Sequence, residues 1–405
     1  MSSRTKLLVV TTSTLITVLL LIGSVLGKST SPDEAYKHIG VFTDVISRIK
    51  SEYVEEPDMK SVTLGALNGL LEAIDPFASY LSAEQYKEYL KARDSRKADV
   101  GLILSRKFGY VGVVGAVPGS PAAKAGLTTG DMIETIKGIA TRDMPLAYAS
   151  MLLQGDPGST IELTVVRVRR PEPTQVKLTR ANLVLPTVEE KMMPNNVGYI
   201  KPGALSPGKV KEVAAAIERL AKAGAQRIVL DLRNCAVGSP DDGVALANLF
   251  MKSGRITYLQ GQRVQRQNID ADATKAITAL PLAVLTNRGT ADGAEITVAA
   301  LLDSKRAQTV GERTYGDASL RRAITMDDGG AIILSVAKYY SPSGKSIQDN
   351  GVTPASLVSE PEAQVDLDDN GEPLPDAPEA PAPQKKLEDD PLYKKAIEVL
   401  GTTKA

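Results

Sequence analysis

The sequence predicts a protein of the α+β or mixed α/β class, built from three successive parts. Apolar residues recur at helical spacing between residues 33 and 94. Short β-type runs alternate with glycine and proline turns between residues 98 and 180. From residue 197 to 354, strands alternate with helices, which favours a mixed sheet covered by helices.

The composition excludes several classes of function. The chain has 405 residues, with 48 basic and 48 acidic side chains, and no basic stripe interleaved with aromatic residues, so a nucleic-acid partner is not expected. Cys235 is the only cysteine, which excludes an intramolecular disulfide and a CxxC metal site. His38 is the only histidine, which excludes a zinc site built on two histidines. We therefore expect no metal and no cofactor.

The N-terminus has the pattern of an export signal. Arg4 and Lys6 precede a run from Leu7 to Gly27 that is apolar apart from threonine and serine. Its length matches the roughly 20 residues that span a bilayer, and the basic residues favour a cytoplasmic N-terminus. A small residue at Gly27 also allows cleavage. We expect an exported protein, either anchored in the inner membrane facing the periplasm or released into the periplasm.

The first part of the chain is predicted to be helical. Asp75-Pro76 ends its second apolar stretch, and Ser82 is placed to cap a helix over Ala83 to Ala92. The apolar positions of the two stretches are Ile39, Phe42, Val45, Ile46 and Ile49, and then Leu64, Leu67, Leu70, Leu71 and Ile74.

The second part is predicted to contain strands at Val111 to Val114, Met132 to Ile136 and Ile161 to Val168. In the string Gly119 to Asp131, Ser120 caps a short helix, Pro121 starts it and Gly126 ends it. This string, with Ile133, Ile136 and Gly138 after it, resembles a PDZ domain of the bacterial protease type.

The PDZ resemblance implies a peptide-binding function. Such a domain adds an extended peptide as a strand to an open sheet edge. The resemblance assigns the loop that holds the terminal carboxylate on backbone N–H groups to Val100, Gly101, Leu102 and Ile103. The implied partners are peptide or protein C-termini.

The third part predicts a helix over Lys209 to Ala223 followed by a continuous apolar strand at Ile228 to Leu232. Further expected elements are a strand at Leu282 to Thr286, a helix over Ala291 to Leu302 and a strand at Ala331 to Val336. Proline and acidic residues dominate from Ser359 to Asp390, which predicts a disordered linker, and Lys385 to Leu400 has the pattern of a short helix.

Five segments of this third part, together with the PDZ string and the stretch Tyr53 to Leu81, resemble the C-terminal processing (tail-specific) serine proteases in one collinear order. The five segments are Val197 to Ile200, Leu230 to Asn234, Asn287 to Ile296, Thr314 to Arg321 and Ala337 to Gln348. The resemblance implies a ClpP/crotonase-like core. The expected organisation is a signal or anchor (1–28), a helical dimerisation region (33–96), a β-barrel-like PDZ domain (97–181), the core (182–356), a linker (357–390) and a terminal helix (391–405).

The resemblance also implies a catalytic serine, a lysine base and an assisting glutamine. The matching positions hold Asp292, Asp317 and Arg321, and the separation of 292 from 317 agrees with the family without a gap. The oxyanion loop is expected to be degenerate at Val237, Gly238 and Gly293, because Val237 stands where a glycine is expected.

Three interpretations of these replacements remain open. In the first, catalysis is lost and Arg321 pairs with one or both carboxylates. In the second, the two carboxylates share a proton or bind a cation. In the third, Thr290 or Cys235 acts as the nucleophile. The first predicts an exported pseudoprotease that acts as adaptor, scaffold or regulator, as a homodimer or beside an active relative. The alternative is a peptidase with an altered mechanism, or one that works in complex with an active partner.

Overall fold

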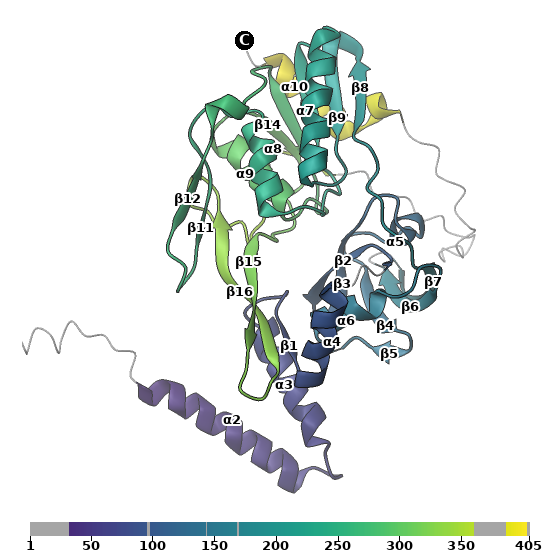
Figure 1. The fold of residues 1–405 in the computed structure, drawn as a ribbon, viewed down its shortest axis with the longest axis vertical. Helices are drawn as coiled ribbons and strands as arrows, with labels where there is room; N and C mark the ends of the chain where they lie inside the picture. Colours follow the sequence, from purple (N-terminus) through teal and green to yellow (C-terminus); the bar gives the residue numbers. More distant parts are fainter. Residues whose placement is uncertain (1–31, 95–97, 143, 168–169, 360–385, 403–405) are drawn as a thin grey trace, which may run out of the picture. The chain divides into compact units, whose positions relative to one another are not determined.

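The computed structural model describes residues 32–94, 98–142, 144–167, 170–359 and 386–402 (Figure 1). The predicted anchor lies outside these residues. No helix in these ranges is both long enough and apolar enough to cross a membrane. The chain divides into two compact units after residue 63.

The helical part begins with α2, which belongs to the first unit, and α3 runs across the division at residue 63. Ser82 caps α4 as predicted, since its hydroxyl accepts the N–H of Gln85 and its own N–H donates to the Gln85 side chain. Ile39, Val41 and Val45 of α2 are about half exposed or more, at 59%, 63% and 49%. The elements are α2 (Pro32–Glu52), α3 (Met59–Glu72), β1 (Ser79–Leu81) and α4 (Ala83–Asp94).

The second part is a sheet in the order β2-β3-β4-β6-β7, with β5 paired to β4. Ser120 caps α5 through the N–H of Ala123, with Pro121 at the first helical position, which confirms the sequence prediction. The sheet's elements are β2 (Leu102–Lys107), β3 (Tyr110–Ala116), β4 (Met132–Ile136), β5 (Ile139–Ala140), β6 (Thr160–Arg167) and β7 (Arg170–Thr179), with helices α5 (Pro121–Lys124) and α6 (Leu146–Leu153).

The third part contains a six-stranded sheet in the order β17-β14-β13-β10-β9-β8, in which only β8 is antiparallel to its neighbour. A second sheet joins β1, β16, β11 and β12, with β15 paired to β16. Strands of the six-stranded sheet are β8 (Glu189–Met193), β9 (Val197–Lys201), β10 (Arg227–Asp231), β13 (Leu282–Thr286), β14 (Gln308–Gly311) and β17 (Ser356–Leu357). The second sheet adds β11 (Arg255–Gln260), β12 (Gln267–Asp270), β15 (Ser319–Thr325) and β16 (Ala331–Tyr340).

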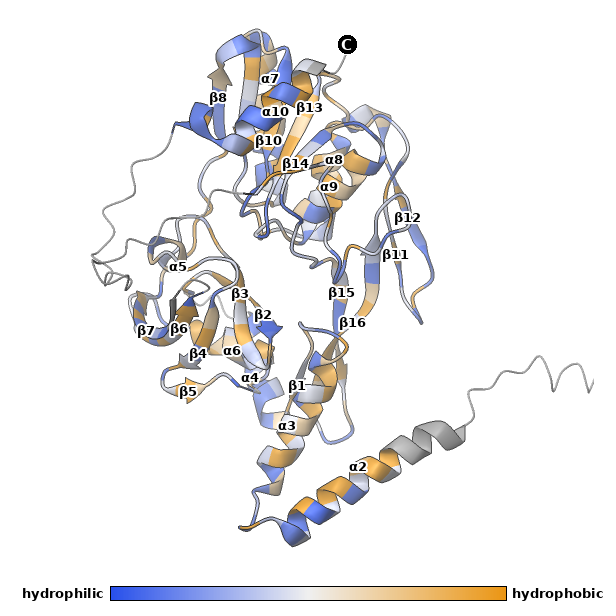
Figure 2. Ribbon diagram, turned by 180° about the vertical axis from the view of Figure 1, so that it is seen from behind, coloured by the Kyte–Doolittle hydropathy of each residue, from blue (hydrophilic) through white to orange (hydrophobic). Residues whose placement is uncertain are grey.

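Both faces of the six-stranded sheet are buried, which explains the continuous apolar runs in its strands. On β10, Ile228 and Leu230 belong to the core formed with α7, α8 and α9, whereas Val229 belongs to the core formed with α10. The hydrophobic residues of β10 and β13 are coloured orange in Figure 2. The covering helices are α7 (Pro207–Lys222), α8 (Pro240–Asn248), α9 (Gly293–Asp303) and α10 (Pro391–Thr402).

Glycines allow α8 and α9 to pack closely. A Cβ on Gly243 would lie 1.9 Å from the carbonyl oxygen of Gly293, and one on Gly293 would lie 2.2 Å from the carbonyl oxygen of Ser239. Ser239 and Asp242 form a capping box that satisfies backbone N–H groups at the start of α8.

Most predicted element positions agree with the structure, and three differ. The helix expected from Ala291 begins at Gly293, because Asp292 has a positive φ of 52°. The strand expected to end at Val336 continues to Tyr340, since it pairs with both β15 and β11. Both ends of the predicted linker are ordered, because Leu357 pairs with β14 and residues 387–389 form a 3₁₀ turn. Residues 360–385 lie outside the described ranges.

Candidate functional site

Asp292 stands at the start of α9, just beyond the buried strand β13. Its backbone has φ 52° and ψ −125°, a conformation that costs energy for a residue with a side chain. The side chain is half-buried and makes no capping hydrogen bond to the helix. The position therefore presents a carboxyl group, which lacks the alcohol hydroxyl that a serine nucleophile needs.

Asp317 and Arg321 form an ion pair, as one part of the first interpretation predicts. Asp317 is only 6% exposed, and Arg321 donates a hydrogen bond to its Oδ1. The guanidinium carbon of Arg321 lies 4.0 Å from the centre of the Phe77 ring, so a cation–π contact also holds it. The only ion pair of Arg321 in the part of the chain that the structure describes is with Asp317, so pairing with both carboxylates is not observed.

Glu295 is a third acid of the site, which the sequence reasoning did not single out. It is fully buried on the first turn of α9 and accepts hydrogen bonds from the backbone N–H groups of Gly316 and Asp317, both at 2.7 Å, and from the Thr314 hydroxyl. Glu295 thus holds the loop that carries Asp317. Its signal in the sequence was an acid in the first turn of a mostly apolar helix.

Burial raises the pKa of all three acids of the site. Burial raises the pKa of Glu295 to about 8, although its hydrogen bonds act in the opposite direction. Burial, and then the charge of Asp317, raise the pKa of Asp292 well above its usual range, while Arg321 opposes the rise. Burial also raises the pKa of Asp317, against the charge of Arg321. Burial thus favours the neutral forms of Asp292 and Glu295.

The loop that the sequence assigns to the oxyanion site follows β10. Val237 is not among the residues with positive φ, so the valine adopts an ordinary conformation, whereas Asn234 has φ 57°. The carbonyl of Val237 accepts the N–H of Leu205 at 2.7 Å. A Cβ on Gly238 would lie 2.7 Å from the Cβ of Leu205, so a close approach requires this glycine.

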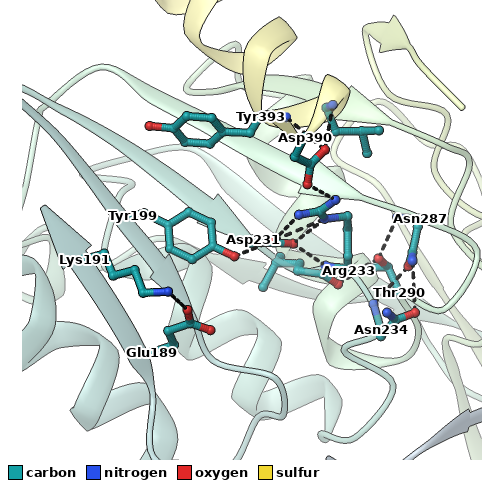
Figure 3. Close-up of polar contacts among 12 residues, drawn as sticks. Glu189, Lys191, Tyr199, Asp231, Arg233, Asn234, Asn287, Thr290, Asp390 and Tyr393 are labelled. Atoms are coloured by element: carbon teal, nitrogen blue, oxygen red, sulfur yellow. Dashed lines mark hydrogen bonds and ion pairs between the residues drawn. The ribbon is translucent and has the colours of Figure 1, made fainter. Parts of the chain in front are cut away.

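A polar network anchors this loop to the C-terminal helix (Figure 3). Arg233 lies between the fully buried Asp231, at 2.6 Å, and Asp390 just before α10, also at 2.6 Å. The Tyr199 hydroxyl donates to Asp231 at 2.7 Å, and the Tyr199 ring makes an edge contact with Tyr393 of α10. The loop's position is therefore set partly by a segment more than 150 residues away in the sequence.

The two alternative nucleophiles have structural roles. Thr290 is fully buried, donates its hydroxyl to the carbonyl of Leu232 at 2.8 Å and accepts the N–H of Asn287. Cys235 is also fully buried, and burial raises the pKa of its thiol to about 12. A thiol with that pKa is not a nucleophile near neutral pH. The structure thus does not support the third interpretation.

The structure gives one observation on the cation-binding interpretation. In the described ranges, no group of three or more His, Cys, Asp or Glu side chains is placed to hold a metal ion. A cavity of about 480 Å³ lies between residues 115–129 and residues 186–203, and Arg233 and Asn234 line it. Asp292, Asp317 and Arg321 do not line this cavity.

The predicted carboxylate loop precedes β2, which is an edge strand paired with β3. Val100 is fully buried, and Gly101 has φ 83°. A Cβ at Gly101 would lie 2.4 Å from the Cβ of Ser120, so only glycine fits there. The arrangement provides the open sheet edge that peptide addition requires.

Comparisons with known proteins identify two regions. Residues 196–358 match the model of peptidase family S41, and residues 112–167 match that of the PDZ domain. The carboxy-terminal-processing protease of Bartonella bacilliformis is 31% identical over 334 residues, which cover 80% of this chain and 76% of that protein. The chain belongs to the C-terminal processing protease family.

Two further relatives agree with this assignment. The carboxyl-terminal-processing protease of a Picosynechococcus strain is 33% identical over 322 residues, which cover 76% of each protein. The solved structure of a photosystem II D1 C-terminal processing protease has a TM-score of 0.65 and 27% identity, covering 78% of this chain and 92% of that one. The family fold is thus shared, including the PDZ domain and the S41 core.

Proposed function

We propose that this member of the C-terminal processing protease family is a pseudoprotease, which binds peptides through its PDZ domain without cleaving them. The observation that carries the proposal is the Asp317–Arg321 ion pair beside Asp292. A Ser–Lys mechanism needs a hydroxyl and a neutral amine at these two positions. Here one position holds a carboxyl group and the other holds an anion already paired with an arginine.

The intact PDZ fold supports the binding half of the proposal. The edge of β2 remains available next to a loop of defined geometry, and the family resemblance makes peptide C-termini the first ligands to test. A protein that binds without cleaving suits the role of an adaptor, scaffold or regulator. The exposed apolar residues of α2 support a further part of the proposal, pairing with a second copy or with an active relative.

The proposed location is outside the cytoplasm, facing the periplasm as an anchored or a released protein. The support is the apolar run from Leu7 to Gly27 behind Arg4 and Lys6. A periplasm-specific enzymatic reporter fused after residue 405 is expected to be active, and an inactive reporter would contradict export.

The proposed absence of cleavage is tested with unfolded protein substrates. The full chain is expected to cleave none of them, and Asp292→Ala is expected to change nothing. Cleavage that Asp292→Ala abolishes would contradict the proposal and would support the alternative, a peptidase with an altered mechanism. Activity that appears only with a co-purified relative would support the partner arrangement instead.

Restoring the catalytic set gives a matched positive control. The triple variant Asp292→Ser, Asp317→Lys and Arg321→Gln places the family's groups on the same backbone, including the strained position 292. The wild type should remain below this variant in cleavage of the same substrates. Measurable cleavage by the wild type at a rate comparable to that of the triple variant would refute the pseudoprotease proposal.

A further inference from the structure

The loop predicted to bind a peptide carboxylate already holds one that belongs to the chain. Asp99 directly precedes the loop, and its Oδ1 accepts a hydrogen bond from the backbone N–H of Gly101 at 2.7 Å. This N–H is one of the donors that the PDZ resemblance assigns to a ligand's terminal carboxylate. A backbone N–H has one proton to donate, so a bound terminus would have to displace Asp99.

Backbone hydrogen bonds hold Asp99 and the two residues after it in place. Asp99 and Ala181 exchange two backbone hydrogen bonds, at 3.1 and 3.0 Å. The carbonyl of Val100 accepts the N–H of Ala122 at 2.9 Å, and the carbonyl of Gly101 accepts that of Val117 at 2.8 Å. The loop therefore cannot move away from Asp99 without breaking these bonds, and the carboxylate is preorganised in its place.

A buried cation acts on the charge of Asp99. Burial raises the pKa of Asp99, whereas the backbone N–H groups of Gly101 and Val100 and the charge of Arg180, which is only 4% exposed, act in the opposite direction. The hydrogen bonds of Arg180 go to uncharged groups, namely the Leu152, Leu153 and Thr160 carbonyls and the Ser159 hydroxyl. The loop thus has an acidic side chain on one of its N–H groups, and a cation acting on that side chain, without any ligand.

The other end of the open edge is also occupied by the chain. The N–H of Arg106, near the end of β2, donates to the carbonyl of Pro76 at 2.8 Å. An added peptide strand is therefore confined to the stretch between Gly101 and Ser105, and it meets the Asp99 carboxylate where a PDZ ligand would place its own terminus.

We propose that Asp99 makes this PDZ edge reject free C-termini and bind internal extended segments instead. The inference rests on the proposed peptide-binding function and revises the class of ligand. A terminal carboxylate would approach a like charge and compete for the same N–H, both of which are unfavourable. An internal segment continues with a backbone N–H or a basic side chain, which can donate to Asp99.

The test compares short peptides of varied sequence in three forms: with a free carboxylate, with a C-terminal amide, and embedded in a longer peptide. Binding to the full chain is measured by fluorescence polarisation. We expect the amide and embedded forms to bind about 10-fold more tightly than the free acids, which corresponds to a repulsion between partly hydrated charges.

Two variants of Asp99 test whether this residue causes the preference against free carboxylates. Asp99→Ala frees the N–H of Gly101, and Asp99→Asn removes the charge while keeping a side-chain acceptor. Both are expected to raise the affinity for free acids, and Asp99→Ala is expected to reverse the preference. Asp156→Asn, at an exposed aspartate of the same domain, is the matched control and should change nothing. Circular dichroism confirms that each variant is folded.

A wild-type preference for free acids, or an acid-to-amide ratio that neither Asp99 variant changes, would overturn the inference while leaving peptide binding intact. Failure of the wild type and both variants to bind any peptide would refute the proposed binding function itself, and the inference with it.

Discussion

Raising the pH should destabilise this protein, because Glu295 is buried with an elevated pKa. The folded protein holds the Glu295 proton up to a pKa of about 8, whereas the unfolded chain releases it near the ordinary value of 4.5. Between these values the folded state binds more protons than the unfolded state, so the free energy of unfolding falls as the pH rises. One pKa unit corresponds to about 1.4 kcal/mol, so the loss attributable to Glu295 reaches about 5 kcal/mol by pH 8.

The measurement is urea unfolding followed by circular dichroism at intervals between pH 5 and 9. Histidine normally titrates in this range, but the chain has a single histidine, so the carboxyl groups of the site dominate the dependence. Asp292 and Asp317 act in the same direction, since burial raises the pKa of each.

Glu295→Gln isolates the contribution of this residue. The amide cannot accept all the hydrogen bonds that Glu295 accepts, so this variant is expected to be less stable at pH 5. Its unfolding free energy should nevertheless fall much less between pH 5 and 8 than that of the wild type. Glu218→Gln, at an exposed glutamate of α7, should retain the wild-type slope. A wild-type stability that is flat or rises over this range, or an unchanged slope in Glu295→Gln, would refute the reasoning.

Three further predictions follow from the same region. Cys235 is expected to resist thiol reagents in the native protein and to react only after unfolding, and rapid native labelling would contradict its buried position and its pKa of about 12. Asp390→Ala removes one partner of Arg233 and should lower the unfolding free energy by about 1–3 kcal/mol in urea titrations, with faster proteolysis near α10. Arg321→Met leaves Asp317 buried without its cation and should lower the free energy of unfolding by about 3 kcal/mol at pH 8. The loss should be smaller at pH 5, because burial raises the pKa of Asp317 and a protonated Asp317 needs no cation. An equal loss at both pH values would count against the ion pair.

Local sequence patterns predicted most of the fold because they are local physical constraints. The alternation of Ile228, Val229 and Leu230 fills two opposite faces of one strand, so the run had to be apolar throughout. The Ser120-Pro121 start of α5 needs only its neighbours to form. The start of α9 was misplaced by two residues, because the backbone conformation of Asp292 depends on how α9 packs against α8.

The sequence by itself determined which side chains stand at positions 292, 317 and 321, and with them the absence of a serine and a lysine there. It could not determine which acid Arg321 pairs with, nor that Glu295 holds the loop of Asp317. Nor did it indicate that Asp390 reaches Arg233 or that Asp99 occupies the loop of Gly101. The reason is that charges interact through space, and their pKa values depend on burial and distance, which only the folded chain sets.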